Sequence, residues 1–513
     1  MIEKAEDIKL NVQPVYFGMR HLCVYEGPCR SGAGDQLTTE FDDMRNATGW
    51  EEFKEDMDKR LPKELFNVME PLKYIRTDDW EIKETWWDEM KATTAEADIY
   101  LFHPNIGTDG MVLEFMERFN KPCTIEPETV YPCSGPALCA AIRARNKNYD
   151  FDAFLTWEDL IAHLKAIRAR KVIGSFRLLC APRLNSQVSM SSVDTFSDQQ
   201  YITEKLGVQF RFVNLHELLD QMRPAPEGGN ATTPGRTSWN LTEEDMKKAE
   251  KMADEFIAGA SSCEIEREYL LTSLYAYLTI MKTMDRLDCN GFTMPCPDSC
   301  STRRLDERSF TPCFIHTLLQ RDGIPSACEY DAATAVTEQA LIAMTGKRPY
   351  NGNVFSIFRY EGKWPRAMGV AEKDIPKLEE NEGNLFSIHH SVPHNRMKSP
   401  SADEPYVLRH FTQDRGFGPV MRYDFGKDEG QEITLCRIAP DGNTMFLAKA
   451  TIVCNDGYEK DSCNGGFVFR VADRDDFYKK QKMAGNHLSC VYGDYIEDMK
   501  KLAEALDMEA VVA

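Results

Sequence analysis

The chain has 513 residues, of which 42% are hydrophobic and 28% charged. This composition is typical of globular proteins, and the length predicts roughly two to four domains. The formal net charge is −21 at pH 7, which argues against a nucleic-acid or anionic-membrane partner, because both surfaces are bound mainly through lysine and arginine.

Residues 1–20 contain no basic region followed by a long apolar run, and no stretch approaches the about 18 apolar residues of a membrane-spanning helix. We therefore expect a cytoplasmic protein with no membrane partner. The 16 cysteines are expected to be reduced thiols, since no secretory signal accompanies them. No CxxC pair occurs, which gives little support to a zinc ribbon or an iron–sulfur cluster.

Short apolar runs alternate with helical patterns in the first third of the chain. Strands are predicted at 13–18, 98–103 and 123–125, and helices at 111–119, 136–145 and 157–168. Thr156 precedes the last helix as an N-cap, with Asp159 three residues further on. This alternation predicts a parallel sheet covered by helices, in an N-terminal α/β domain of residues 1–170.

The same alternation returns in residues 171–347, which we predict to be a second α/β domain. The expected elements are strands at 172–182 and 208–214 and helices at 197–207, 215–222, 242–259 and 265–287. Residues 224–241 are rich in proline, glycine, threonine and asparagine and are expected to form a surface loop within this domain.

The last third has a different pattern. Apolar runs separated by turn residues occur at 407–412, 418–425, 431–440, 445–453 and 465–471. They predict an antiparallel barrel or sandwich, in a C-terminal domain of residues 348–513. A helix is expected at 495–508.

Glu329 is the centre of the functional prediction. It lies between a short apolar segment that contains cysteines and an alanine-rich helix opened by Asp331. We expect it at a strand-to-helix junction, where sheet enzymes hold their chemistry, and we expect a metal there. Two simpler interpretations stay open: Glu329 caps a helix or pairs with an arginine, and Asp331 is only an N-cap.

The string TPCFIHTLLQRDGIPSACEYD, with the helix ending in TG and the GN that follows, resembles the central block of the L-fucose isomerase and L-arabinose isomerase superfamily. The ending GNHLSCVYGDYIEDMKKLAEALDMEAV is similar to the C-terminus of this family, and EADIYLFHPNIGTDG, WEDLIAHLKAIRARKV and GQEITLCRIAPDGNTMF extend the resemblance over nearly the whole chain. The resemblance implies two Rossmann-like α/β domains followed by a C-terminal domain with an antiparallel β-barrel. It also implies a homotrimer or homohexamer that uses a divalent metal, usually manganese, to convert aldoses to ketoses.

The family pattern implies that Glu329 is both a metal ligand and an acid/base catalyst, and that His487 is a second metal ligand. The third ligand of the family is an acid that also transfers protons, and here 353 − 329 = 24 places Asn353 at that position. Asparagine offers a carbonyl oxygen to a cation but cannot accept a proton. The second proton transfer would then pass to water, to a substrate hydroxyl, or to Asp331 or Asp298.

Further candidates are implied for substrate binding. His390, in FSIHHSVPHNRM, is the best match to an additional histidine of the arabinose isomerases, although a loop histidine bonded to backbone would fit the pattern equally well. Arg304, in STRRLDERSF, and Arg30, in EGPCRSGAG, are predicted to contact an anionic sugar or a neighbouring subunit, because a guanidinium fork suits anions. The alternative for such a charge run is a solvated surface. Asp298 is also predicted to bind the substrate.

These residues predict a metal-dependent aldose–ketose isomerase that acts through an enediolate on a small sugar, with Mn²⁺ or another divalent metal as cofactor. A cation that binds both O1 and O2 of the sugar would hold the charge that develops when the C2 proton leaves. The alternatives are an epimerase or other relative acting on a modified or anionic sugar, a non-catalytic sugar-binding homologue, and a cysteine-based redox protein.

Overall fold

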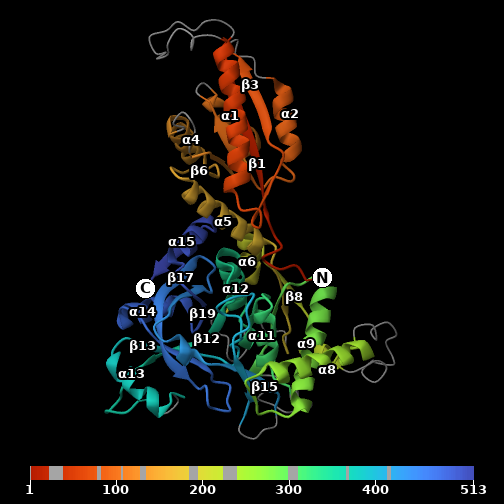
Figure 1. The fold of residues 1–513 in the computed structure, drawn as a ribbon, viewed down its shortest axis with the longest axis vertical. Helices are drawn as coiled ribbons and strands as arrows, with labels where there is room; N and C mark the ends of the chain where they lie inside the picture. Colours follow the sequence, from red (N-terminus) through yellow and green to blue (C-terminus); the bar gives the residue numbers. More distant parts are fainter. Residues whose placement is uncertain are drawn as a thin grey trace. The chain divides into compact units, whose positions relative to one another are not determined.

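The computed structural model describes residues 2–21, 39–77, 83–105, 108–127, 134–183, 195–222, 240–297, 310–364, 369–412 and 417–513. The chain divides into two compact units (Figure 1). The N-terminal unit is Ile8–Arg168, and the main unit is Met1–Asp7 with Ala169–Ala513. The division lies inside helix α5 (Trp157–Gly174), as does the predicted boundary at 170/171. The predicted boundary at 347/348 stays a prediction.

The N-terminal unit contains an open parallel sheet. Its strands are β1 (Leu10–Arg20), β2 (Phe66–Val68), β3 (Leu72–Thr77), β4 (Ile99–Pro104), β5 (Cys123–Ile125) and β6 (Phe151–Ala153). In the described ranges the strand order is β2–β1–β4–β5–β6, β3 also pairs with β1, and every pairing is parallel.

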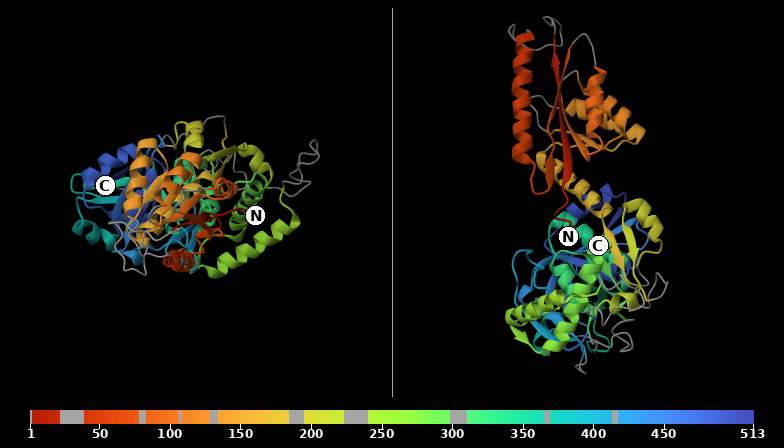
Figure 2. Two further views of the ribbon diagram at one scale, coloured as in Figure 1. Left: turned by 90° about the horizontal axis from the view of Figure 1, so that it is seen from above. Right: turned by 90° about the vertical axis from the view of Figure 1, so that its right-hand side faces the viewer.

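Helices cover both faces of this sheet, which explains why β4 is buried at every position. They are α1 (Thr39–Arg60), α2 (Glu84–Thr93), α3 (Asp109–Phe119), α4 (Ser134–Lys147) and the first part of α5. Figures 1 and 2 show α1 and α2 on opposite sides of β1 and β3.

The main unit contains a second parallel sheet. Its strands are β7 (Arg177–Cys180), β8 (Gln209–Phe212), β10 (Gly291–Thr293) and β11 (Ser326–Ala327), in the order β11–β10–β7–β8. The helices of this region are α6 (Gln199–Leu206), α7 (Leu215–Asp220), α8 (Glu243–Gly259), α9 (Arg267–Arg286), α11 (Pro312–Arg321) and α12 (Ala332–Thr345). The helix α5 continues to Gly174, where the sequence predicted a strand from residue 172, because a short apolar run fits either element. Most of the loop predicted at 224–241 lies outside the described residues.

A closed antiparallel barrel forms the other part of the main unit. Its strands are β12 (Tyr350–Ile357), β13 (Leu385–His389), β16 (Glu432–Ile438), β17 (Thr444–Asp456), β18 (Gly466–Arg470) and β19 (His487–Tyr492). In the part of the chain that the structure describes, the order is β16–β19–β12–β13–β18–β17, and pairing of β17 with β16 closes the ring. The predicted mixed α/β class with parallel sheets and an antiparallel barrel is confirmed.

Further elements surround the barrel. They are the helices α13 (Ile375–Glu380), α14 (Arg474–Ala484) and α15 (Ile496–Ala505), the strand β20 (Glu509–Val512), which pairs in parallel with β17, and the 3-10 turns η4 (Glu372–Asp374) and η5 (Phe425–Asp428). A third 3-10 turn, η3 (Cys328–Tyr330), follows β11 of the parallel sheet. None of the helices in the described ranges combines the length and the apolar character needed to cross a bilayer.

Two strands predicted for the barrel belong elsewhere. The strand β14 (Tyr406–His410) pairs with β15 (Pro419–Tyr423) on one side and with β9 (Ser262–Cys263) on the other, in a separate sheet. Leu408 and Met421 pack into the apolar cluster of α9 and α11 rather than into the barrel interior. Alternating hydrophobicity predicts a strand but does not identify its partners, which explains the error.

The alternation of side chains along the barrel strands positions the polar residues of the site. Val354 and Leu488 belong to the apolar cluster of the barrel, so their neighbours Asn353 and His487, which face each other across β12 and β19, point outward. Helix α12 packs against β16 and β19 on this outer surface.

Glu338, on α12, connects the parallel sheet to the barrel. Its buried carboxylate accepts hydrogen bonds from Ser326 N (2.7 Å), Gln320 Nε2 (2.8 Å) and Asn351 Nδ2 (2.5 Å). Burial nevertheless raises the pKa of Glu338 to about 8. The folded protein therefore binds this proton more tightly than the unfolded chain does.

We predict that the pKa of Glu338 makes the main unit less stable as the pH rises. Between about pH 5 and about pH 8 its carboxyl lowers the free energy of unfolding by up to about 1.4 kcal/mol per pH unit. Glu338→Gln should remove this contribution, as measured by urea unfolding across that range, whereas Glu497→Gln, on the exposed side of α15, should not. Equal pH slopes for the wild type and Glu338→Gln would contradict the prediction.

Candidate metal centre

Glu329 lies in a tight turn that follows the last strand of the parallel sheet in chain order. The strand β11 ends at Ala327, and Glu329 and Tyr330 adopt the left-handed backbone conformation, with φ of 60° and 64°. Residues without glycine's freedom hold such angles at a cost of about 1–3 kcal/mol each, so the surrounding structure must fix them. Tyr330 N donates to Met294 O at 3.0 Å, and Asp331 N to Cys328 O at 3.2 Å. Glu329 thus lies at the strand-to-helix junction that the sequence predicts.

Glu329 meets two histidines of the barrel. Its Oε2 lies 3.4 Å from Nε2 of His487, and its Oε1 lies 3.6 Å from Nε2 of His390. The two Nε2 atoms are 3.1 Å apart. These ligand atoms all lie within 4.8 Å of one another. One carboxylate and two imidazoles at this spacing could hold a divalent metal ion.

The other ring nitrogen of His487 is hydrogen-bonded to Asp331. Its Nδ1 lies 2.9 Å from Oδ2 of Asp331, and the same carboxylate accepts from Arg437 (2.8 Å) and from Thr334 N (3.0 Å) as the N-cap of α12. A carboxylate that accepts a hydrogen bond from Nδ1–H fixes the orientation of the ring and directs Nε2 toward a cation, an arrangement typical of metal-binding histidines. Asp331 is therefore the N-cap of α12, and it also contacts the site through His487.

The two acids and two histidines of the site, Glu329, Asp331, His390 and His487, differ sharply in charge. Burial alone would lower the pKa of His487, but hydrogen bonds and charges from Asp331 and Glu329 raise it to about 10. Burial and the neighbouring His487 lower the pKa of His390 to about 3. Burial opposes ionisation of both acids, yet His487 holds the pKa of Glu329 below its ordinary value, and Arg437 with His487 does the same for Asp331.

The candidate centre therefore consists of the ionised Glu329, the neutral His390 and a positively charged His487, which has a proton on each ring nitrogen. The proton on Nε2 lies where three metal-ligand atoms converge. A divalent cation can replace it, because metal ligands exchange their protons for the ion when it binds.

Asn353 lies beside this group but presents its nitrogen to it. Its Nδ2 is 2.9 Å from Nε2 of His390, while its Oδ1 accepts a hydrogen bond from Nδ2 of Asn486. If both amides turned by half a rotation, their mutual hydrogen bond would survive and the Asn353 oxygen would face the group. Asn353 as a metal ligand stays a prediction that requires this rotation.

The structure brings together all five of the predicted site residues that it describes. Glu329, His390 and His487 form one group, and Asn353 and Asp331 contact its members. The predicted substrate-binding residues Arg30, Asp298 and Arg304 lie outside the described residues.

Sequence reasoning missed two residues of the site. Arg437 was assigned only to a strand, although an arginine within the apolar run LCRI signals a buried and paired charge. Asn486 gave no signal beyond its place immediately before His487.

No protein-family model matches this chain, and no curated protein matches it.

We predict that Asp331→Asn weakens metal binding. Asparagine keeps the N-cap but cannot balance the charge of Arg437 or fix His487, so the affinity for Mn²⁺ should fall about 10–100-fold, as measured by calorimetric titration. Unfolding should also become easier by about 3–5 kcal/mol, because Arg437 loses its buried partner.

Asp198→Asn is the matched control for this variant. It makes the same change at the exposed N-cap of α6 and should leave Mn²⁺ affinity unchanged. Wild-type affinity in a folded Asp331→Asn protein would show that His487 is not a ligand held by this carboxylate.

Proposed function

We propose that this protein is a metal-dependent aldose–ketose isomerase, with Glu329, His390 and His487 as the ligands of a divalent metal, Mn²⁺ in the first instance. The observation that supports this most is the convergence of one ionised carboxylate and two imidazole nitrogens. A second carboxylate, Asp331, orients one of these imidazoles. The cation would supply electrostatic stabilisation of the negative charge that develops on two adjacent sugar oxygens.

Glu329 is the proposed proton carrier. Its side chain is 16% exposed, whereas that of Asp331 is 1% exposed and occupied by Arg437. The lowered pKa of Glu329 keeps it ionised at neutral pH. In the proposed reaction it takes the proton from C2 of the aldose, the electron pair of that bond forms the C1–C2 double bond of an enediolate, and the π pair of the C1 carbonyl moves onto O1. The proton held by Glu329 exchanges with solvent, and Glu329 then delivers a proton to C1 while O2 becomes the carbonyl oxygen.

The proton that moves between the two sugar oxygens needs another carrier. Asn353 cannot accept it, and both oxygens of Asp331 are engaged by Arg437, Thr334 and His487. We therefore assign this transfer to water or to a substrate hydroxyl.

The resemblance to the L-fucose and L-arabinose isomerase superfamily supports the same proposal. From this resemblance we also propose that each parallel sheet belongs to a Rossmann-like domain and that the protein is a homotrimer or homohexamer in the cytoplasm.

A second candidate follows from Asn353. A site with one proton carrier could also remove and replace a proton at a single carbon, which would make the protein an epimerase acting on a modified or anionic sugar.

We predict that the protein with Mn²⁺ exchanges the C2 proton of a substrate sugar with solvent, and that Glu329→Gln lowers this exchange about 10²–10⁴-fold. Glutamine keeps the shape of the side chain but cannot accept the proton. Exchange in deuterated water, followed by NMR over a panel of pentoses, hexoses, deoxysugars and acidic sugars, measures it. Glu497→Gln should exchange like the wild type. No exchange with any sugar, or equal exchange in Glu329→Gln, would overturn the proposal.

We predict that Asn353→Asp increases the affinity for Mn²⁺ about tenfold or more, because a charged oxygen would replace a neutral amide beside the cation. Calorimetric titration measures it. Asn443→Asp adds the same charge at an exposed position of the main unit and should have no effect. An unchanged or lower affinity in Asn353→Asp would place residue 353 outside the metal's reach.

A further inference from the structure

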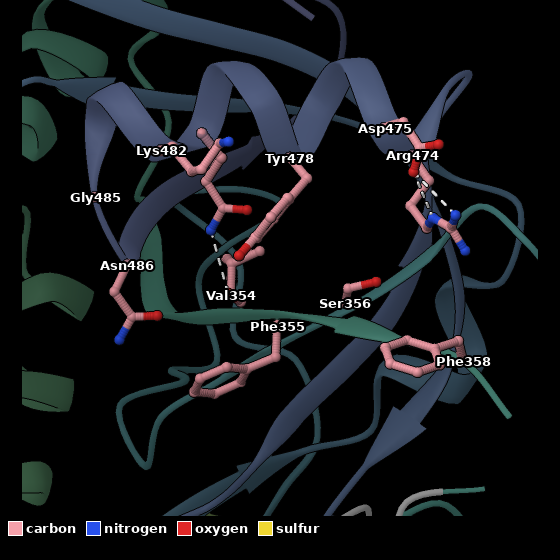
Figure 3. Close-up of a pocket in the computed structure, with 11 residues that line it drawn as sticks. Val354, Phe355, Ser356, Phe358, Arg474, Asp475, Tyr478, Lys482, Gly485 and Asn486 are labelled. Atoms are coloured by element: carbon pink, nitrogen blue, oxygen red, sulfur yellow. Dashed lines mark hydrogen bonds and ion pairs between the residues drawn. The ribbon is translucent and has the colours of Figure 1, made fainter. Parts of the chain in front are cut away.

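A cavity of about 830 Å³ lies between helix α14 and strand β12. Figure 3 shows Tyr478 and Lys482 on the helix, Phe355 and Ser356 along the strand, and Asn486 at one end. The metal centre does not use the helix side of this cavity.

The cavity and the metal centre share a wall. Asn486, which lines the cavity, precedes the proposed ligand His487 and donates to Oδ1 of Asn353. Val354 N donates to Asn486 O at 3.0 Å, which fixes this wall to β12. A molecule in the cavity would therefore lie next to the amide pair that borders the metal group.

Three aromatic rings at the cavity are unusually exposed. The exposed fractions of Phe355, Phe358 and Tyr478 are 46%, 48% and 53%, and all three residues line the same cavity. Aromatic rings gathered around a concave site with a few polar groups are typical of a small-molecule site. Here the polar groups include the hydroxyls of Ser356 and Tyr478, which can bond the hydroxyls of a sugar.

Lys482 gives the cavity a positive charge. Its Nζ lies 5.6 Å from the centre of the Tyr478 ring, and among the described residues it forms no ion pair with a carboxylate. The other cation of the cavity, Arg474, is paired with Asp475 at 2.9 Å. In a chain with a net charge of −21, an unpaired lysine beside aromatic rings favours an anionic ligand.

We propose that this cavity binds the anionic end of the sugar substrate, with the sugar ring against Tyr478 and the anion on Lys482. The substrate is then a sugar that carries a phosphate or a carboxylate away from its reacting carbons. This inference rests on the proposed isomerase function, but the binding itself does not require the metal.

The test is calorimetric titration of the metal-free full chain, in EDTA and at low salt, with glucose, glucose 6-phosphate, glucuronate and inorganic phosphate. At least one anionic sugar should bind about tenfold or more tightly than glucose, and Lys482→Ala should remove this advantage without changing glucose binding. Tighter binding of glucose 6-phosphate than of glucuronate would identify the anion as a phosphate, and the reverse order would identify it as a carboxylate. Tyr478→Ala should weaken every sugar but not inorganic phosphate.

Lys479→Ala is the matched control, because it removes the same charge from an exposed position of α14 that does not line the cavity. The proposal is overturned if no anionic sugar binds more tightly than glucose, or if Lys479→Ala weakens binding as much as Lys482→Ala. If C2 exchange occurs, Lys482→Ala should raise KM for the anionic sugar and leave kcat unchanged, and an unchanged KM overturns the substrate assignment. Intact binding without C2 exchange in any sugar would contradict the isomerase function but not the cavity.

Discussion

The ion pair between Asp331 and Arg437 connects the two parts of the main unit. Asp331 is the N-cap of α12, which follows strand β11 of the parallel sheet, and Arg437 lies on the barrel strand β16. Both side chains are 1% exposed. Arg437 also donates to the backbone oxygens of Ala484 and His487. A buried charge is tolerated only when it is paired and hydrogen-bonded, so removal of either partner would leave the other uncompensated. The position of α12 on the barrel is therefore fixed beside the candidate metal centre.

This pairing also explains how two acids in one turn acquire different chemistry. Glu329 and Asp331 are two residues apart, yet Asp331 points to a guanidinium and caps a helix, while Glu329 points to two imidazoles. The left-handed backbone at Glu329 and Tyr330 separates their directions. Arg437 holds the first carboxylate ionised and occupied, so only the second is available to exchange protons with a ligand.

The sequence predicted what is encoded locally. The strand β5 matches its predicted range, and Gly207 ends α6 with φ of 80°, as a C-terminal glycine should. Pairing between distant strands was not predictable in this way, because alternation in β14 and β15 is the same whether they join the barrel or β9. The approach of Glu329 to His487 came from the family resemblance, and Arg437 was missed because its partner lies 106 residues away in the chain.

Asn353 changes the charge balance of the proposed centre and thereby the ligand it favours. With an acid at this position, two carboxylates would neutralise a divalent cation, whereas Glu329 alone neutralises it by half. Asp331 adds nothing to this balance, because Arg437 already compensates it. In the proposed reaction the remaining positive charge would stabilise the enediolate, and it would also favour an anionic substrate before any reaction. Lys482 lines the same cavity as Asn486 and carries a charge of the same sign. An asparagine rather than an acid at residue 353 therefore fits the proposed specificity for a charged sugar, and it leaves the proposed reaction with one proton carrier fewer.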